Sequence, residues 1–314
     1  MAWLLSFFAP MKLRTDLMKL HLKLGNMNFI PFAFMEDVLS NFSATRSLAR
    51  YKKLSGSFGK YANRWEENAY TTILYVENGT FTRFRDHRHN QPIGPAGNVE
   101  NSAKYRLWKV VAYKVSDNQI PKIDPNLPRG LDEFAVESGM LCLSLRTSKI
   151  DEKWVKLFSS WKHLNTLIIH STLSGPTLHL LFSLLDREQL VRVGIFSENY
   201  GDREVYLFKQ FLQQSQFLSL EFMSNTNSNS LLKERILAEE DLKKFVGSTV
   251  HWKRKEQLHN DSFEKVGLVD ESLLLFKKRN LLAYYFNDAA TQSTTDEEFV
   301  AGARSSLLRF VHEE

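Results

Sequence analysis

The chain has 314 residues, of which 43% are hydrophobic and 25% are charged, so it is long enough and apolar enough to bury a globular core. Its one cysteine, Cys142, excludes an intramolecular disulfide framework, and no set of cysteines and histidines has the spacing of a structural zinc site. The net charge of +5 does not require a polyanionic partner. We therefore expect a cytoplasmic or nuclear protein that binds no metal, cofactor or nucleic acid and is not held in a membrane.

The first 68 residues carry helical patterns. Residues 1–26 are expected to form an extension, whose leucines recur at amphipathic-helix spacing: Leu13, Leu17, Leu20 and Leu24. This pattern fits either docking on a partner or membrane surface, or loose packing on the body of the protein. Residues 27–68 are predicted to form two or three short helices, because their apolar residues recur mostly at steps of three and four.

A β-hairpin is predicted within residues 71–85, where Asn78-Gly79 separates two β-prone runs. Both central residues of a type I′ turn need positive φ, and this dipeptide tolerates it. Three further segments are predicted after the hairpin: a loop over 86–104, a strand over 107–114 and a proline-containing connector over 120–130. Residues 69–130 are thus expected to form a hairpin and loop connector.

Residues 131–290 alternate short apolar runs with helical segments. The apolar runs are residues 143–145, 167–169, 193–195 and 220–222. Their third residues are 24, 26 and 27 positions apart, and strand-helix units of this length are typical of leucine-rich-repeat-like solenoids. An irregular α/β layer with the same connectivity is the alternative. The predicted fold class is α+β, with a small N-terminal helical segment, a β-hairpin linker region and a C-terminal β-α repeat layer.

Several helix boundaries and end elements are predicted in this second half. Ser148 with Asp151 resembles a capping box, and Asp202 is a candidate cap for a later helix. A charged helix over 231–245 and a hairpin over 272–286 are predicted next. Residues 291–314 are expected to form a tail with a last helix that ends at Phe310.

Catalytic chemistry is not indicated by the sequence. It contains none of the common hydrolase, zinc-protease or nucleotide-binding motifs, so we expect no catalytic residues and no enzymatic activity. His87 and His89 alternate as metal ligands on a strand would, but no third ligand is near them in the sequence. His163, His170 and His179 are interpreted as surface or packing histidines. A hydrolase or transferase site formed by loops is the alternative from another class.

Residues 29–65 resemble an F-box. F-boxes typically open with a Leu-Pro pair, place apolar pairs three and four and then seven and eight residues after the proline, and close with a Val-Ser-x-x-Trp-like signature. The matching residues here are Ile30-Pro31 for the opening pair, Phe34-Met35 and Val38-Leu39 at those offsets, Leu48 for the middle helix, and Leu54-Ser55-Gly-Ser-Phe58 for the close. The chain is similar in particular to an F-box-like family greatly expanded in nematodes, whose members join such a start to a strand-helix C-terminal region.

This resemblance implies a function in ubiquitination. F-box segments bind a Skp-type adaptor of a cullin-RING ubiquitin ligase, while the C-terminal domain captures a target protein. The resemblance assigns adaptor binding to Ile30, Pro31, Phe34, Met35, Val38, Leu39, Leu48, Leu54 and Phe58. Covering each exposed apolar side chain with a partner would contribute about 1.5–3 kcal/mol. Two alternatives stay open: these residues pack as ordinary core, or the chain is a repeat-domain scaffold with no ligase connection.

Overall fold

The computed structural model describes residues 59–60, 63, 70–87, 106–115, 127–137, 140–197, 200–223, 230–253, 256–259, 262–291 and 294–312. These residues form helices together with parallel and antiparallel strands, so the α+β class is confirmed. The chain divides into two compact units, residues 1–143 and residues 144–314. All residues assigned to adaptor binding, and the extension over 1–26, lie outside the described residues.

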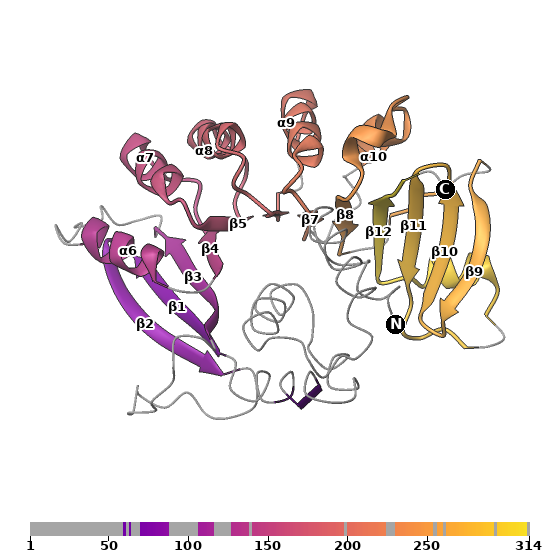
Figure 1. The fold of residues 1–314 in the computed structure, drawn as a ribbon, viewed down its shortest axis with the longest axis horizontal. Helices are drawn as coiled ribbons and strands as arrows, with labels where there is room; N and C mark the ends of the chain where they lie inside the picture. The colour runs from indigo at the N-terminus through magenta and orange to yellow at the C-terminus, as the bar shows by residue number, and fades with distance from the viewer. Residues whose placement is uncertain are drawn as a thin grey trace, which may run out of the picture. The chain divides into compact units, whose positions relative to one another are not determined.

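The N-terminal unit contains the predicted hairpin. Strands β1 (Tyr70–Glu77) and β2 (Thr80–His87) pair antiparallel. The φ angles of Asn78 and Gly79 are 51° and 85°, so both turn residues have the positive φ that a type I′ turn requires. The predicted third strand is also confirmed, because β3 (Arg106–Lys114) pairs parallel with β1 and gives the order β2-β1-β3 (Figure 1).

A helix that was not predicted, α6 (Leu127–Val136), packs on this sheet. Its buried residues recur at helical spacing on one side: Leu127, Leu131, Phe134 and Ala135. The predicted connector over 120–130 is therefore wrong for residues 127–130. Pro128 was interpreted as a loop residue, but it lies in the first turn of the helix, where a missing backbone N–H breaks no helical hydrogen bond.

Two basic side chains join α6 to the strands beneath it. Lys109 of β3 is fully buried, and its Nζ donates to the carbonyl oxygens of Phe134 and Ala135 at 3.2 and 2.7 Å and also to that of Glu137. Carbonyl groups at a helix C-terminus carry partial negative charge, so they suit a buried ammonium group. Arg83 of β2 binds the Glu137 carboxylate at 2.8 Å, and its guanidinium lies 5.3 Å from the centre of the Phe134 ring.

The C-terminal unit begins within β4 (Met140–Leu145) and continues with parallel strands in chain order: β5 (Leu164–Ile169), β6 (Arg192–Ile195), β7 (Ser219–Phe222) and β8 (Thr249–Trp252). The apolar runs predicted as strands are confirmed by β4 to β7, whereas β8 was not predicted. One backbone contact recurs after each of β5 to β8. The N–H group of the residue that follows each strand donates to the last carbonyl oxygen of the neighbouring strand that comes before it in the chain. The donors are His170, Phe196, Met223 and Lys253, and the distances are 2.8, 2.8, 2.8 and 2.9 Å.

Helices connect these strands and lie next to one another over one face of them (Figure 1). They are α7 (Glu152–Ser160), α8 (Gly175–Asp186), α9 (Asp202–Gln213) and α10 (Ser230–Leu237). Successive strand-helix units are also joined by side chains. The side-chain amides of Gln189 and Gln214 donate to the carbonyl oxygens of Trp161 and Leu185, at 2.9 and 2.7 Å.

Two helix starts differ from their predicted form. Asp151 is itself the N-cap of α7, and its carboxylate accepts two backbone N–H groups of the first turn at 2.9 and 3.1 Å, so it is not the third residue after a cap at Ser148. The N-cap of α9 is Gly201, whose N–H donates to the Glu204 carboxylate at 2.8 Å. Asp202 is therefore the first helical residue and not the cap.

The predicted charged helix over 231–245 is two separate helices. The first, α10, ends at Leu237, and the 3-10 helix η3 (Leu242–Phe245) follows it. Asp241 starts this second helix, because its carboxylate accepts the backbone N–H of Lys243 at 3.2 Å. Within the part of the chain that the structure describes, no helix has the length and apolar character that crossing a membrane requires.

Antiparallel strands extend the C-terminal unit beyond β8. In spatial order they are β12 (Ser305–Phe310), β11 (Leu281–Phe286), β10 (Leu273–Lys278) and β9 (Glu264–Asp270). The pairing of β10 with β11 confirms the predicted hairpin over 272–286. The predicted last helix up to Phe310 is wrong, because α11 (Asp296–Ala301) ends early and a strand follows it between β8 and β11.

Candidate protein-binding surface

The strands of the C-terminal unit turn one face toward the helices and the other face away from them. Side chains alternate along a strand, so the buried Leu220 and Phe222 of β7 point to the helix side and Glu221 points to the other side. Cross-strand pairing continues this second face, because Glu221 lies opposite His251 on β8, and His251 lies opposite Leu307 on β12. Among the described residues no helix covers this side (Figure 1).

We call this surface the open face. It combines charged, aromatic and aliphatic side chains from strands that are far apart in the sequence: Ile168, His170, Arg192, Phe196, Glu221, Met223, His251, Tyr284, Phe286 and Leu307. Most of them are partly exposed. Aromatic and arginine side chains on a surface of this kind are enriched at protein interfaces.

A partly buried ion pair lies on the open face. Arg192 Nε is 3.3 Å from Glu221 Oε1, and the two side chains retain only 23% and 16% of their exposure. Ser219 donates its hydroxyl to the same carboxylate oxygen at 3.4 Å. Because such a pair is screened less by salt than a fully exposed one, it fixes a local pattern of charge that a partner must match.

An imidazole and a hydroxyl lie within hydrogen-bond distance at the end of the parallel strands. Ser144 Oγ is 3.0 Å from His170 Nε2. This distance is within the range that separates the nucleophile from its base in hydrolases. Ser144 is only 5% exposed, however, and the His170 ring stacks on Phe196 with centroids 4.2 Å apart. Burial, and secondarily the charge of Arg146, lowers the pKa of His170 and keeps the ring neutral. This arrangement supports the interpretation of His170 as a packing residue.

The remaining predicted histidines do not gather into a site. His163 is exposed, and His179 binds the Glu152 carboxylate at 2.9 Å on the helix side. That acidic partner, 27 residues away, was missed, although the repeat spacing could have indicated it. Of the two histidines with alternating spacing, His87 and His89, the second lies outside the described residues. In the described ranges no three His, Cys, Asp or Glu side chains come together as metal ligands would.

A buried hydrogen-bond network lies on the helix side of β10 and β11. The Tyr285 hydroxyl accepts the backbone N–H groups of Leu258 and His259 at 2.6 and 3.1 Å, and it lies 2.7 Å from His259 Nδ1. With both lone pairs occupied, the hydroxyl must donate its own proton to Nδ1, so the imidazole is neutral with its proton on Nε2. The ring stacks on Phe276, with centroids 3.9 Å apart. Burial raises the pKa of Tyr285 to about 12 and lowers that of His259.

We expect the free energy of unfolding to fall as the pH is lowered from about 7 to about 5. Histidines in the unfolded chain take up protons near pH 6.5, whereas the lowered pKa values of His259 and His170 keep them neutral in the folded state. The unfolded state therefore binds more protons in this window, and stability is lost as the pH falls. Urea unfolding at several pH values measures the slope.

The variant His259→Gln should flatten this pH dependence, and His163→Gln, a change at an exposed position, should leave it unchanged. Equal slopes for the wild type and both variants would show that the partly buried imidazole of His259 does not contribute.

The sequence identified β5 to β7 and β11 of the open face, but it did not identify β8, β12 or the face itself. The alternation of Arg192 and Glu221 with buried neighbours was a usable signal, but it does not show which strands lie side by side. The residues assigned to adaptor binding, from Ile30 to Phe58, lie outside the described residues, so their assignment stays a prediction. Comparison of the chain with family models, with curated proteins and with solved structures finds no match.

Proposed function

We propose that this chain is an F-box-like substrate receptor, in which residues 27–68 bind a Skp-type adaptor of a cullin-RING ubiquitin ligase and the C-terminal unit captures a target protein. Target capture is supported by the open face, a mixed aromatic and charged surface on the side of the strands opposite the helices. Adaptor binding is supported by the spacing of apolar residues from Ile30 to Phe58.

A repeat-like platform fits target capture. Two recurring contacts support a stack of similar strand-helix units. One is the backbone hydrogen bond that follows each of β5 to β8, and the other is the hydrogen bond from the side-chain amides of Gln189 and Gln214 to a backbone carbonyl of the preceding unit. Such stacks offer extended, rigid surfaces on which side chains can vary without a change of fold. A rigid surface loses little entropy on binding, which favours affinity for a folded or extended partner.

A scaffold without a ligase connection is the second candidate. It keeps target capture by the open face, and it is favoured by Phe58, which stands where the closing signature commonly has tryptophan. The two functions differ in one component of the complex, the adaptor with its ligase subunits.

Affinity purification of the tagged chain, followed by mass spectrometry, tests adaptor binding and target capture separately. Pro31→Ala combined with Phe34→Ala should lose the adaptor and cullin but keep the target. Tyr284→Ala, on the open face, should lose the target and keep the ligase subunits. The matched control Tyr206→Ala removes a tyrosine that is 61% exposed on α9 and should keep both.

Two results would contradict the proposal. If the wild type purifies without any ligase subunit, the ligase connection is wrong and the scaffold function remains. If Tyr206→Ala loses the target and Tyr284→Ala keeps it, the binding surface is not the open face.

A further inference from the structure

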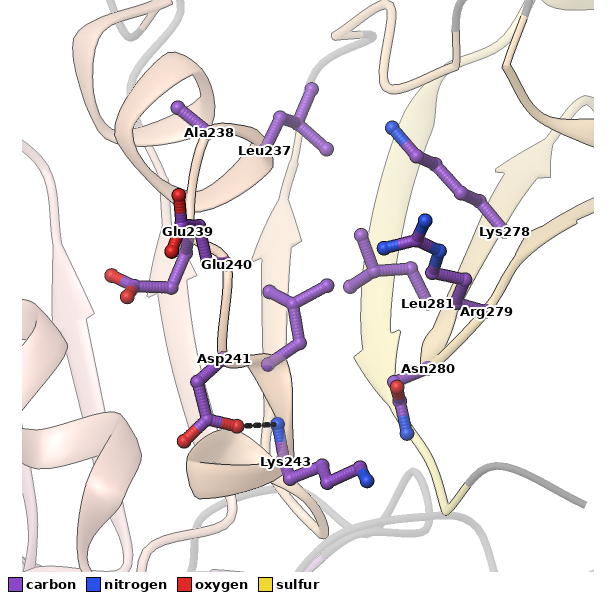
Figure 2. A pocket seen from close by; sticks show the side chains of 11 residues that line it. Leu237, Ala238, Glu239, Glu240, Asp241, Lys243, Lys278, Arg279, Asn280 and Leu281 are labelled. Atoms are coloured by element: carbon purple, nitrogen blue, oxygen red, sulfur yellow. Dashed lines mark hydrogen bonds between the residues drawn. The ribbon is translucent and has the colours of Figure 1, made fainter.

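A pocket of about 350 Å³ opens in the C-terminal unit, away from the open face. One wall is the segment from the end of α10 to η3, and the other wall is the turn between β10 and β11 (Figure 2). Its volume is at the lower end of the range for ligand-binding pockets. The lining also includes leucines, of which Leu237 is partly exposed, Leu242 is 9% exposed and Leu281 is fully buried, so a small apolar surface lies between the charged parts of the two walls.

The two walls carry opposite charge. Figure 2 shows Glu239, Glu240 and Asp241, together with the single basic residue Lys243, on one side and Lys278 and Arg279 on the other, so the net charges of the two walls are opposite. A ligand that carries both signs would match this pocket better than a purely anionic or purely cationic one, because each charge meets its opposite.

These charged groups differ in how far they are already occupied. Glu239 accepts hydrogen bonds from Lys209 and Lys244, which lower the pKa of its carboxyl group. Its negative charge is therefore already paired with positive charges of the protein. Asp241 caps η3. Within the described residues, no hydrogen bond or ion pair occupies the side chains of Glu240 and Arg279, and both are exposed. Lys278 already contacts the Phe263 ring, with its Nζ 5.6 Å from the ring centre. Glu240 and Arg279 are therefore the acidic and the basic group most available to a ligand.

The fold holds Arg279 in a conformation that arginine rarely adopts. Its φ is 45°, in the left-handed region that favours glycine and that costs an L-residue about 1–2 kcal/mol. The neighbouring turn residue, Asn280, is 6% exposed and is tied to the C-terminal end of β12. Its side-chain amide donates to the Val311 carbonyl oxygen, and its own carbonyl accepts the Val311 N–H, at 2.9 and 2.8 Å. The backbone of the turn is thus fixed, so the Arg279 side chain extends from a fixed backbone position at the pocket.

We propose that this pocket binds the free carboxyl end of a target polypeptide, with the terminal carboxylate on Arg279, an apolar last side chain on the leucines and a basic upstream side chain on Glu240. Guanidinium groups bind carboxylates through paired, charge-assisted hydrogen bonds, and capture of a terminal carboxylate is a recurring mode of peptide recognition. This proposal rests on the proposed function as a target receptor and names the feature of the target that is recognised.

The test is fluorescence anisotropy with the purified full chain and a labelled octapeptide that ends in Arg-Ala-Leu with a free carboxylate. The same peptide with a C-terminal amide should bind at least tenfold more weakly. The variant Arg279→Gly should also lose at least tenfold in affinity while its unfolding midpoint stays equal or rises, because glycine relieves the left-handed strain. A purely structural role of Arg279 would instead lower the midpoint.

Specificity is tested by reversing the charge of the opposite wall. Glu240→Lys should weaken binding of the peptide with arginine and strengthen binding of a peptide that has glutamate at that position. The control Glu271→Lys makes the same change of charge at an exposed residue outside the pocket and should have no effect. Equal affinity of the acid and the amide, or no binding of the acid by the wild type, would overturn the proposal.

Adaptor binding measured on the same preparations separates this inference from the proposed function. If the adaptor binds and the peptide does not, only the pocket proposal is wrong. If the peptide binds as described and the adaptor does not, the pocket proposal holds and the ligase connection is wrong.

Discussion

Replacing Phe222 with alanine is expected to lower the free energy of unfolding of the C-terminal unit by about 3–5 kcal/mol. Phe222 lies on the helix side of β7, is 1% exposed, and contacts three other rings. The centroid distances are 5.4 Å to Tyr200, 5.7 Å to Phe208 and 6.0 Å to Trp252. Removing the central ring leaves a cavity between α9, β7 and β8, and the surrounding backbone cannot collapse to fill it.

Urea unfolding followed by tryptophan fluorescence and circular dichroism measures this loss. The matched control is Tyr206→Ala, which also removes an aromatic ring but from an exposed position on α9, and it should change the free energy of unfolding by no more than about 0.5 kcal/mol. Similar unfolding midpoints for the two variants would show that the cluster around Phe222 is not the core of this unit.

Replacing Lys109 with alanine is expected to release α6 from the N-terminal unit, at a cost of at least about 2 kcal/mol. The fully buried ammonium group donates to the carbonyl oxygens of Phe134, Ala135 and Glu137. Without it, these acceptors at the end of α6 stay buried with fewer donors, and burial of an unsatisfied polar group is unfavourable. Amide hydrogen exchange of residues 127–137, followed by mass spectrometry, should become faster in the variant.

The control for this result is Lys114→Ala on the same strand. Lys114 pairs with Glu77 at 3.2 Å, and both side chains are more than half exposed, so the loss should be small. Unchanged exchange of α6 in Lys109→Ala would show that the helix is held by its apolar side alone.

Local signals in the sequence predicted the parts of the fold that depend on neighbouring residues. The Asn78-Gly79 turn specifies its hairpin because few other dipeptides accept positive φ at both positions. The apolar runs that became β4 to β7 were identified from their regular spacing between helical segments. These signals are contained within about 25 residues, so no knowledge of distant contacts was needed.

The errors come from elements whose structure is decided by distant partners. Thr295 and Glu298 form a true capping box at the start of α11, but the predicted last helix was continued to Phe310 and so wrongly included Ser305–Phe310. That segment has alternating burial and is a strand because β8 and β11 offer it hydrogen bonds on both sides. The edge strand β9 was also missed. Gly267, with a φ of 121°, interrupts its apolar run, and the two register shifts in its pairing with β10 depend on the partner strand.

The two binding surfaces could not be predicted for a related reason. The open face combines side chains from β5 to β8 with others from β11 and β12, and the pocket brings Glu240 opposite Arg279 from a different part of the chain. Sequence alternation shows which residues share a face of one strand, but strand order determines which residues become neighbours. By contrast, the adaptor-binding prediction rests on a local spacing, from Ile30 to Phe58, and can be tested directly.

The most direct test of the proposed receptor function is isothermal titration calorimetry between the purified full chain and a purified Skp-type adaptor. We expect saturable binding with one adaptor per chain, and we expect its loss in the combined variant Phe34→Ala and Met35→Ala, while Tyr284→Ala should bind as the wild type does. No heat of binding from a folded wild-type chain, with the adaptor shown to be active on another F-box segment, would contradict it.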